Sequence, residues 1–113
     1  MSRVIALDLD DTLLRSDYSI SPRTLEMLAA WEASGNRLVV ATGRPPRSIP
    51  DSLPDELMEV PWICYNGAEI RQHGAVIYQD LIPAKCTREV VALIDSHIPD
   101  ICAGLEINNT PLR

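Results

Sequence analysis

The sequence predicts an α/β protein with a parallel sheet, and three neighbouring segments support that prediction. Residues 4–9 (VIALDL) form a short apolar run without alternation, as in a strand that is covered on both faces. Residues 37–44 (RLVVATGR) give a second such run, which ends in small and polar residues, and a segment with helical spacing separates the two. A strand, a helix and a strand with short connections form a right-handed unit, so we expect parallel strands.

The helix predicted between these strands has a start signal and a stop signal. Ser21 can cap its N-terminus, Pro22 suits the first helical position, and Gly35 suits the residue just past its end. The apolar residues of this segment recur at helical spacing and fall on one face: Leu25, Leu28 and Ala29.

The region after residue 44 is rich in proline, which interrupts any long helix: Pro45, Pro46, Pro50 and Pro54. We expect one or two short helical turns between residues 46 and 58, followed by a third buried strand near 62–65. An alternating segment with His73-Gly74 at its centre then predicts a β-hairpin.

Length, composition and charge exclude several classes of protein. At 113 residues the chain is one domain or part of one, and 46% apolar residues are enough for a core. The formal net charge of −6 argues against nucleic acid or an anionic membrane as a partner, because neither would be attracted over distance. No apolar run approaches the roughly 18 residues that span a bilayer. The three cysteines are widely spaced, which favours reduced thiols in a cytoplasmic protein.

The first predicted strand ends in three acidic residues, Asp8, Asp10 and Asp11. Carboxylates this close repel one another, and packing does not explain them at the end of an apolar run. A divalent cation or a phosphoryl group is the usual compensation for such a cluster.

Polar residues also end the second predicted strand, where we expect a ligand site. Ligands of open parallel sheets bind beyond the carboxyl ends of the strands, which here carry Asp8, Asp10, Thr42, Gly43 and Arg44. Carboxylates are hard oxygen ligands for Mg²⁺, whereas a Thr hydroxyl, a Gly amide and a guanidinium group donate to phosphate oxygens. The combination predicts a metal-assisted phosphoryl site.

Three motifs give the sequence a resemblance to a known family. DLDDTLL (8–14) resembles the first motif of the haloacid dehalogenase (HAD) superfamily of phosphohydrolases, an Asp-x-Asp-x-Thr after a buried strand. ATGRP (41–45) resembles the second motif of the Cof-type branch, and YNGAEI (65–70) is similar to the turn that leads into the inserted cap of that branch. The resemblance implies a HAD-like Rossmannoid core and an Mg²⁺-dependent phosphatase of small organic phosphates, such as a sugar phosphate or a phosphorylated cofactor.

The resemblance also implies a role for each matching residue. Asp8 would be the nucleophile that forms an aspartyl-phosphate and would bind Mg²⁺. Asp10 would protonate the leaving oxygen, later activate water, and give its backbone carbonyl to the metal. Phosphate binding would fall to the backbone amides and side chains that follow the two strands: Leu9, Thr42, Gly43 and Arg44.

The same resemblance divides the chain into two parts. Residues 1–66 would be the N-terminal part of the core, with the first two motifs. Residues 67–113 would be the hairpin and first elements of a truncated C2-type α+β cap, with a helix after Pro83 and one more strand in the segment 101–113.

Two further motifs of the family are missing from the sequence. Its only Lys, Lys85, lies in the predicted cap helix, and no acidic cluster follows it to complete the Mg²⁺ shell. We therefore expect these 113 residues to be the N-terminal part of a longer enzyme, incomplete or inactive alone. The first strand would then be an open sheet edge, available to a missing C-terminal part or to self-association.

Two other functions are consistent with parts of the pattern. The chain could be a non-catalytic remnant that binds Mg²⁺ or phosphate, or an interaction module that uses its open strand edge. A receiver-type signalling domain fits less well, because its acceptor Asp should end the third strand. Asp51 and Asp55 instead lie in proline-rich polar sequence.

Overall fold

The structure, a computed structural model, describes residues 1–112 of the chain. The chain folds into two compact units, Met1–Gln79 and Asp80–Arg113. The sequence motifs predict a boundary at 66/67, where buried strands of the parallel type are followed by an alternating hairpin. The hairpin that follows residue 67 pairs with the core sheet, so the compact units divide at 79/80.

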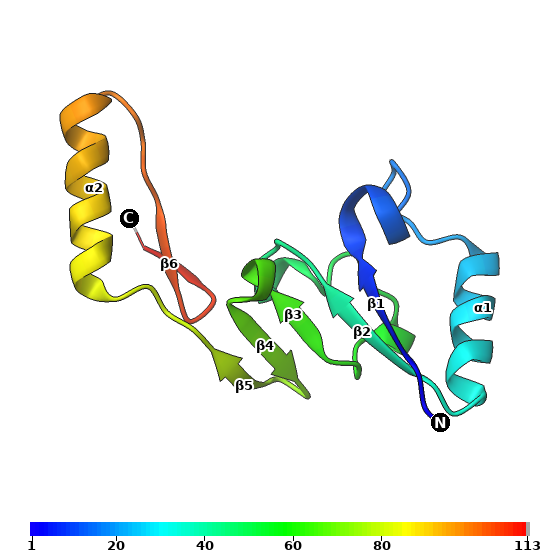
Figure 1. Cartoon of the computed structure of the whole chain (residues 1–113). Helices are drawn as coiled ribbons and strands as arrows, with labels where there is room; N and C mark the ends of the chain where they lie inside the picture. The colour runs from blue at the N-terminus through cyan, green and yellow to red at the C-terminus, as the bar shows by residue number, and fades with distance from the viewer. Residues whose placement is uncertain (113) are drawn as a thin grey trace. The chain divides into compact units, whose positions relative to one another are not determined.

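The first unit contains a five-stranded sheet with the order β1-β2-β3-β4-β5 (Figure 1). β1 (Val4–Asp8), β2 (Arg37–Ala41) and β3 (Trp62–Cys64) are parallel, as the sequence predicts. β4 (Glu69–Gln72) and β5 (Ala75–Gln79) continue the sheet antiparallel. The prediction of an α/β fold with three parallel strands is confirmed.

The helix α1 (Pro22–Ala33) begins and ends where the sequence predicts. Ser21 Oγ accepts a hydrogen bond from the Thr24 backbone amide at 3.1 Å, which satisfies one of the unpaired N–H groups of the first turn. Gly35 follows the helix with a φ of +83°, a conformation that glycine adopts without strain. Trp31 Nε1 donates to the backbone carbonyl of Arg37 at 2.9 Å and so fixes the return into β2.

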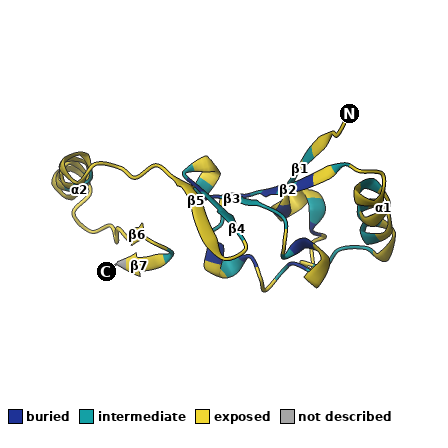
Figure 2. Ribbon diagram, turned by 90° about the horizontal axis from the view of Figure 1, so that it is seen from below, coloured by how far each residue is buried: buried dark blue, intermediate teal, exposed yellow. Residues whose placement is uncertain are grey.

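The core of the first unit lies around β2 and the segment that connects β2 to β3. Two short 3₁₀ helices, η2 (Pro46–Ser48) and η3 (Asp55–Leu57), confirm the helical turns predicted there. Figure 2 shows the buried residues gathered in this part of the first unit. The buried apolar cluster consists of Leu9, Leu14, Leu38, Val40, Ile49, Leu53, Leu57 and Cys64.

The burial predicted for β1 is wrong, although the strand itself is confirmed. Val4 is 59% exposed, and the residues of β1 alternate between exposed and half-buried. β1 is the terminal strand of the described sheet, so only β2 covers it laterally and the predicted open edge is present. The strand is therefore more apolar than expected for a strand that the described residues leave this exposed.

The hairpin predicted at His73-Gly74 connects β4 to β5. Both residues of the turn have positive φ angles, 51° and 76°, which is the backbone geometry of a type I′ turn. Such a turn matches the right-handed twist of antiparallel strands. It keeps β5 paired to β4 even though every residue of β5 is exposed.

The second unit contains one helix and a two-stranded sheet. α2 (Ala84–His97) is the helix expected after Pro83. The segment that follows it contains two strands rather than the single strand predicted, β6 (Leu105–Ile107) and β7 (Thr110–Leu112). Asn108 and Asn109 make the turn with φ angles of 50° and 63°, because asparagine tolerates the left-handed region that a tight hairpin requires.

No helix within residues 1–112 is long and apolar enough to cross a membrane.

The thiol of Cys64 is fully buried at the end of β3. Burial, and then the nearby Glu69 carboxylate, raise the pKa of this thiol to about 11. Glu69 is itself buried, with hydrogen bonds from Arg71 Nε at 2.8 Å and from Gln79 Nε2 at 3.0 Å. The carboxylate therefore has partners, and the cluster joins β3, β4 and β5.

We predict that Cys64 makes the folded protein less stable at alkaline pH. Its pKa is raised on folding, so the unfolded chain loses the thiol proton first, near the ordinary cysteine pKa of 9.0. The stabilisation is complete below pH 9 and is lost as pH rises toward 11, which at pH 10 costs about 1.4 kcal/mol. Urea unfolding at pH 8 and pH 10 should show this extra loss in the wild type but not in Cys64→Ala. Equal losses in the two proteins would contradict it, and Cys86→Ala, at an exposed cysteine, is the control.

Candidate active site

Three parallel strands present their carboxyl ends at one edge of the first unit. The register pairs Asp8 of β1 with Ala41 of β2, and Ala41 with Ile63 of β3. The residues that follow these strands therefore meet, as the sequence predicts. They surround an open cavity of about 350 Å³ that is lined by Asp8, Ala41, Thr42, Gly43, Ile63, Asn66 and Gly67.

The turn after β1, η1 (Leu9–Leu13), holds the acidic residues at this edge. The buried side chain of Leu9 anchors the turn, and the Leu14 amide closes it with a 2.9 Å bond to the Leu9 carbonyl. Asp10 has an extended backbone and Asp11 a φ of 61°, so the chain bends sharply there. Both carboxylates remain exposed, which suits groups that meet a ligand.

Asp8 is oriented from within the same turn. Thr12 Oγ1 donates to Asp8 Oδ2 at 3.1 Å. This hydrogen bond explains the Thr of the Asp-x-Asp-x-Thr pattern, because it fixes a carboxylate that lies exposed at the end of β1 and lines the cavity.

Thr42 is a buried polar residue, 5% exposed, at the end of β2. Its backbone is held from β3, because its amide donates to the Ile63 carbonyl at 2.9 Å and its carbonyl accepts from the Asn66 amide at 3.1 Å. Its Oγ1 accepts from the Arg44 amide at 3.1 Å, which leaves the hydroxyl proton available to an acceptor in the cavity.

Arg44 forms a two-point ion pair with Asp10. Arg44 Nε donates to Asp10 Oδ2 at 2.8 Å, and Nη2 donates to Oδ1 at 2.5 Å. These hydrogen bonds lower the pKa of the Asp10 carboxyl group and raise the pKa of Arg44. The predicted site residues therefore occupy two neighbouring arrangements, Asp8 with Thr42 and Gly43 around the cavity, and Asp10 with Arg44 beside it.

Asn66 also lies at this edge, within the YNGAEI motif (65–70) that the sequence likens only to a turn leading into the cap. It does bend the chain, with a φ of 57°, but it also lines the cavity with Asp8 and Thr42. Gly43 lies so close that a Cβ there would be 2.9 Å from Asn66 Oδ1. The available signal was its position, because Asn66 follows the third parallel strand just as Asp8 and Thr42 end the first two.

The donor set at this edge fits a magnesium ion that shares its shell with substrate. Mg²⁺ is commonly held through one or two carboxylates together with substrate phosphates and water. Asp8 provides an exposed carboxylate that lines the cavity, whereas the carboxylate of Asp10 is engaged by Arg44. Within residues 1–112 no group of three or more His, Cys, Asp or Glu side chains could hold a metal by itself.

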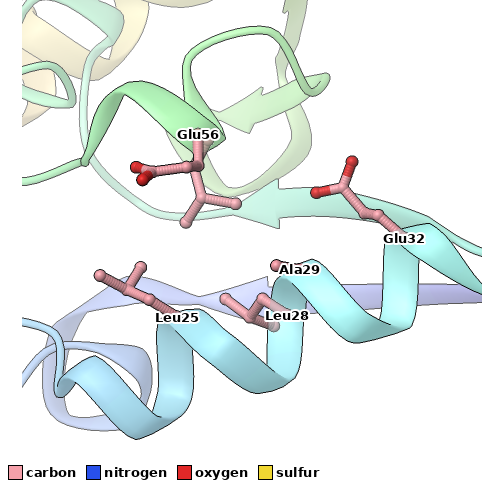
Figure 3. A pocket seen from close by; sticks show the side chains of 6 residues that line it. Leu25, Leu28, Ala29, Glu32 and Glu56 are labelled. Carbon is pink, nitrogen blue, oxygen red and sulfur yellow. The ribbon is translucent and has the colours of Figure 1, made fainter.

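A second cavity lies elsewhere in the first unit, between α1 and η3. It has a volume of about 360 Å³ and is lined mostly by apolar side chains, with two glutamates as its charged members (Figure 3). Its lining residues are Leu25, Leu28, Ala29, Glu32, Glu56 and Leu57. They include neither a basic group nor a hydroxyl, so this cavity is unsuited to a phosphate.

Comparisons with known proteins agree with the fold and the motifs. Residues 5–109 match the haloacid dehalogenase-like hydrolase family. Over 98 residues the chain is 32% identical to pyridoxal phosphate phosphatase YbhA of Escherichia coli. This alignment covers 85% of the chain and 36% of that protein. The chain is also 32% identical to 5-amino-6-(5-phospho-D-ribitylamino)uracil phosphatase YitU of Bacillus subtilis over 99 residues. That alignment covers 83% of the chain and 36% of the relative.

Solved structures resemble the chain over nearly all of its length. A phosphatase of the HAD enzyme superfamily from Bacteroides thetaiotaomicron matches with a TM-score of 0.78 and 31% identity, covering 98% of the chain and 41% of that structure. The protein TM0651 from Thermotoga maritima matches with a TM-score of 0.77 and 25% identity over the same shares of each chain.

The chain therefore belongs to the haloacid dehalogenase-like hydrolase family. The HAD-like fold that its three motifs imply is confirmed, and the receiver-type alternative is excluded. The chain spans about a third of the length of the curated relatives it matches, 36% in both cases.

We predict that Gly43→Ala displaces the Asn66 side chain without unfolding the protein. The new Cβ would meet Asn66 Oδ1 at 2.9 Å, but this side chain is exposed and can rotate away, so the unfolding free energy should change by less than about 1 kcal/mol. The side-chain amide resonances of Asn66 should shift in a ¹⁵N–¹H spectrum. Gly104→Ala, where nothing lies within 4 Å, is the control and should leave them in place. Unshifted Asn66 resonances in Gly43→Ala would contradict the close approach.

Proposed function

We propose that the complete protein is an Mg²⁺-dependent phosphatase that hydrolyses a small phosphate monoester through an aspartyl-phosphate on Asp8. The observation that carries the proposal is the meeting of the exposed Asp8 carboxylate with the Thr42 hydroxyl and the Gly43 backbone around one cavity. This arrangement supports the proposal, because a carboxylate can act as a nucleophile and the hydroxyl and amide groups beside it can donate to phosphate oxygens.

In the first step the Asp8 carboxylate oxygen attacks phosphorus. A bond forms between this oxygen and phosphorus, the bond from phosphorus to the ester oxygen breaks, and the leaving oxygen takes a proton from the Asp10 carboxyl group. Negative charge on a bound phosphate ester favours the protonated form of a neighbouring carboxyl group, which opposes the effect of Arg44 on Asp10. Mg²⁺, when bound, would neutralise charge on the transferring phosphoryl group.

In the second step the Asp10 carboxylate takes a proton from water, and the resulting hydroxide oxygen attacks phosphorus. The bond between phosphorus and Asp8 breaks, which releases inorganic phosphate and restores both carboxyl groups. The Thr42 hydroxyl, with the backbone amides of Leu9 and Gly43, would hold the phosphoryl oxygens through both steps, because hydroxyl and amide groups donate to negative oxygens.

The substrate that we propose is a sugar phosphate or a phosphorylated cofactor. The names of two relatives support this class, since one is a pyridoxal phosphate phosphatase and the other acts on a phosphoribitylamino compound. The cavity of about 350 Å³ is open, so the described residues leave room for an ester larger than phosphate itself.

A second candidate function is phosphate or Mg²⁺ binding without turnover. It is favoured by the donor set of residues 1–112, which provides no cluster of three metal-binding side chains and no Lys at this edge. Turnover separates the two candidates, because binding alone releases no phosphate.

We predict that Asp8→Asn lowers phosphate release by the full-length protein at least about 1000-fold, because an amide is not a nucleophile toward phosphorus. Phosphate release from p-nitrophenyl phosphate with Mg²⁺ measures this loss. EDTA should abolish the wild-type activity and added Mg²⁺ should restore it. Asp95→Asn, at an exposed position on α2, is the control and should keep full activity. A wild-type protein without Mg²⁺-dependent phosphate release, or an active Asp8→Asn variant, would refute the proposal.

A further inference from the structure

The sequence predicts that Arg44 binds phosphate, but its hydrogen bonds go to protein groups. Nε and Nη2 donate to the two oxygens of Asp10, and Nη1 donates to the Ser48 carbonyl at 3.2 Å and to Ser52 Oγ at 2.9 Å. A guanidinium group has five N–H donors on three nitrogens, and all three nitrogens are engaged. A phosphoryl oxygen would have to compete with these partners for most of the donors.

The guanidinium group is also the better anchored half of its ion pair. The Arg44 side chain is 18% exposed, whereas the Asp10 side chain is 46% exposed. The Tyr18 ring lies over the guanidinium group, with its centroid 5.9 Å from Cζ, which is within the range of a cation–π contact. Contacts from the segment 48–52 and from Tyr18 therefore hold Arg44 in place, and Asp10 is the group that gains a fixed position.

We infer that Arg44 is a positioning residue that orients the Asp10 carboxyl group for the leaving oxygen, and that Ser52 supports it in this role. The inference rests on the proposed function, in which Asp10 is the proton donor. Two parallel N–H···O bonds fix both the position and the plane of a carboxyl group, which a single ammonium charge does not. The geometry thus connects the proline-rich segment after β2 to the reaction at the end of β1.

The test compares Arg44→Lys with the wild-type full-length protein on two kinds of substrate. Nitrophenolate leaves readily without a proton, whereas an alkoxide needs one. The aryl substrate is p-nitrophenyl phosphate, and the alkyl substrate is whichever of pyridoxal phosphate and ribose 5-phosphate the wild type hydrolyses faster. We expect kcat for the alkyl phosphate to fall at least about 10-fold more than kcat for the aryl phosphate, with both KM values within about 2-fold.

Two results would overturn the inference. Equal losses of kcat on both substrates would mean that Arg44 does not act on the proton transfer. A rise in KM shared by both substrates, with kcat unchanged, would mean that Arg44 binds the phosphoryl group that the substrates have in common.

A double variant tests whether Arg44 acts through Asp10. If it does, Arg44→Lys in the Asp10→Asn background should reduce alkyl phosphate turnover no further, because the group that it positions is already gone. A second full loss in the double variant contradicts the inference. Arg37→Lys, at an exposed position on β2, is the control and should alter neither substrate.

Ser52→Ala provides the same test with a smaller change to the protein, in case Arg44→Lys does not fold. It removes one anchor of the guanidinium group and leaves every charge in place, so we expect the same preference for the aryl substrate at about 2- to 5-fold. An unchanged substrate ratio in Ser52→Ala overturns the supporting role of Ser52. If the wild type releases no phosphate from any of these substrates, the proposed function fails. An active wild type with a uniform loss in Arg44→Lys refutes the positioning role alone.

Discussion

The parallel pairing of β1 with β2 is the constraint on which the rest of the site depends. It aligns Asp8 with Ala41, so that the turn after β1 and the residues after β2 end at the same level of the sheet. Side chains alternate between the faces of a strand, and a slip of one residue would turn Asp8 to the opposite face from its present neighbours. The buried strand β2 secures the register, since Leu38 and Val40 belong to the core.

Backbone geometry beyond the strands is equally specific. Asp11 and Asn66 both have left-handed conformations: Asp11 bends the turn that follows β1, and Asn66 lines the cavity. Aspartate and asparagine adopt this region more readily than other residues that have a Cβ. The residue types at these two positions therefore suit the backbone angles that the turns require. For Asp11 this conformational preference is a reason for an acidic residue directly after Asp10.

Much of this arrangement could be predicted from the sequence because the signals are local. The cap at Ser21, the turn at His73-Gly74 and the apolar runs of β2 and β3 each determine a structure through nearby residues alone. The alignment of the ends of β1 and β2 could also be predicted, because strands joined by a short βαβ connection are parallel and the connection is right-handed. The motifs then led to the family, which the comparisons bear out.

What could not be predicted depends on contacts between distant residues. The exposure of β1 follows from which strands lie beside it, and no pattern within residues 4–8 contains that information. The ion pair of Arg44 with Asp10 joins positions 34 residues apart, so its partners were visible only in three dimensions. Glu69 likewise resembles an ordinary polar strand residue until Arg71 and Gln79 are seen around it.

The residues of the candidate site are all made early in the synthesis of the chain. Every residue around its cavity lies within the first 67 positions, and the three strand ends come from consecutive segments of the chain. During synthesis the first unit, Met1–Gln79, can therefore form before α2, β6 and β7 have left the ribosome, because N-terminal units generally fold first. Over that interval the free side of β1 is exposed to other nascent chains, and strand edges of this kind promote aggregation. The part of the chain that holds the candidate site is thus also the part whose strand edge is open while the chain is being made.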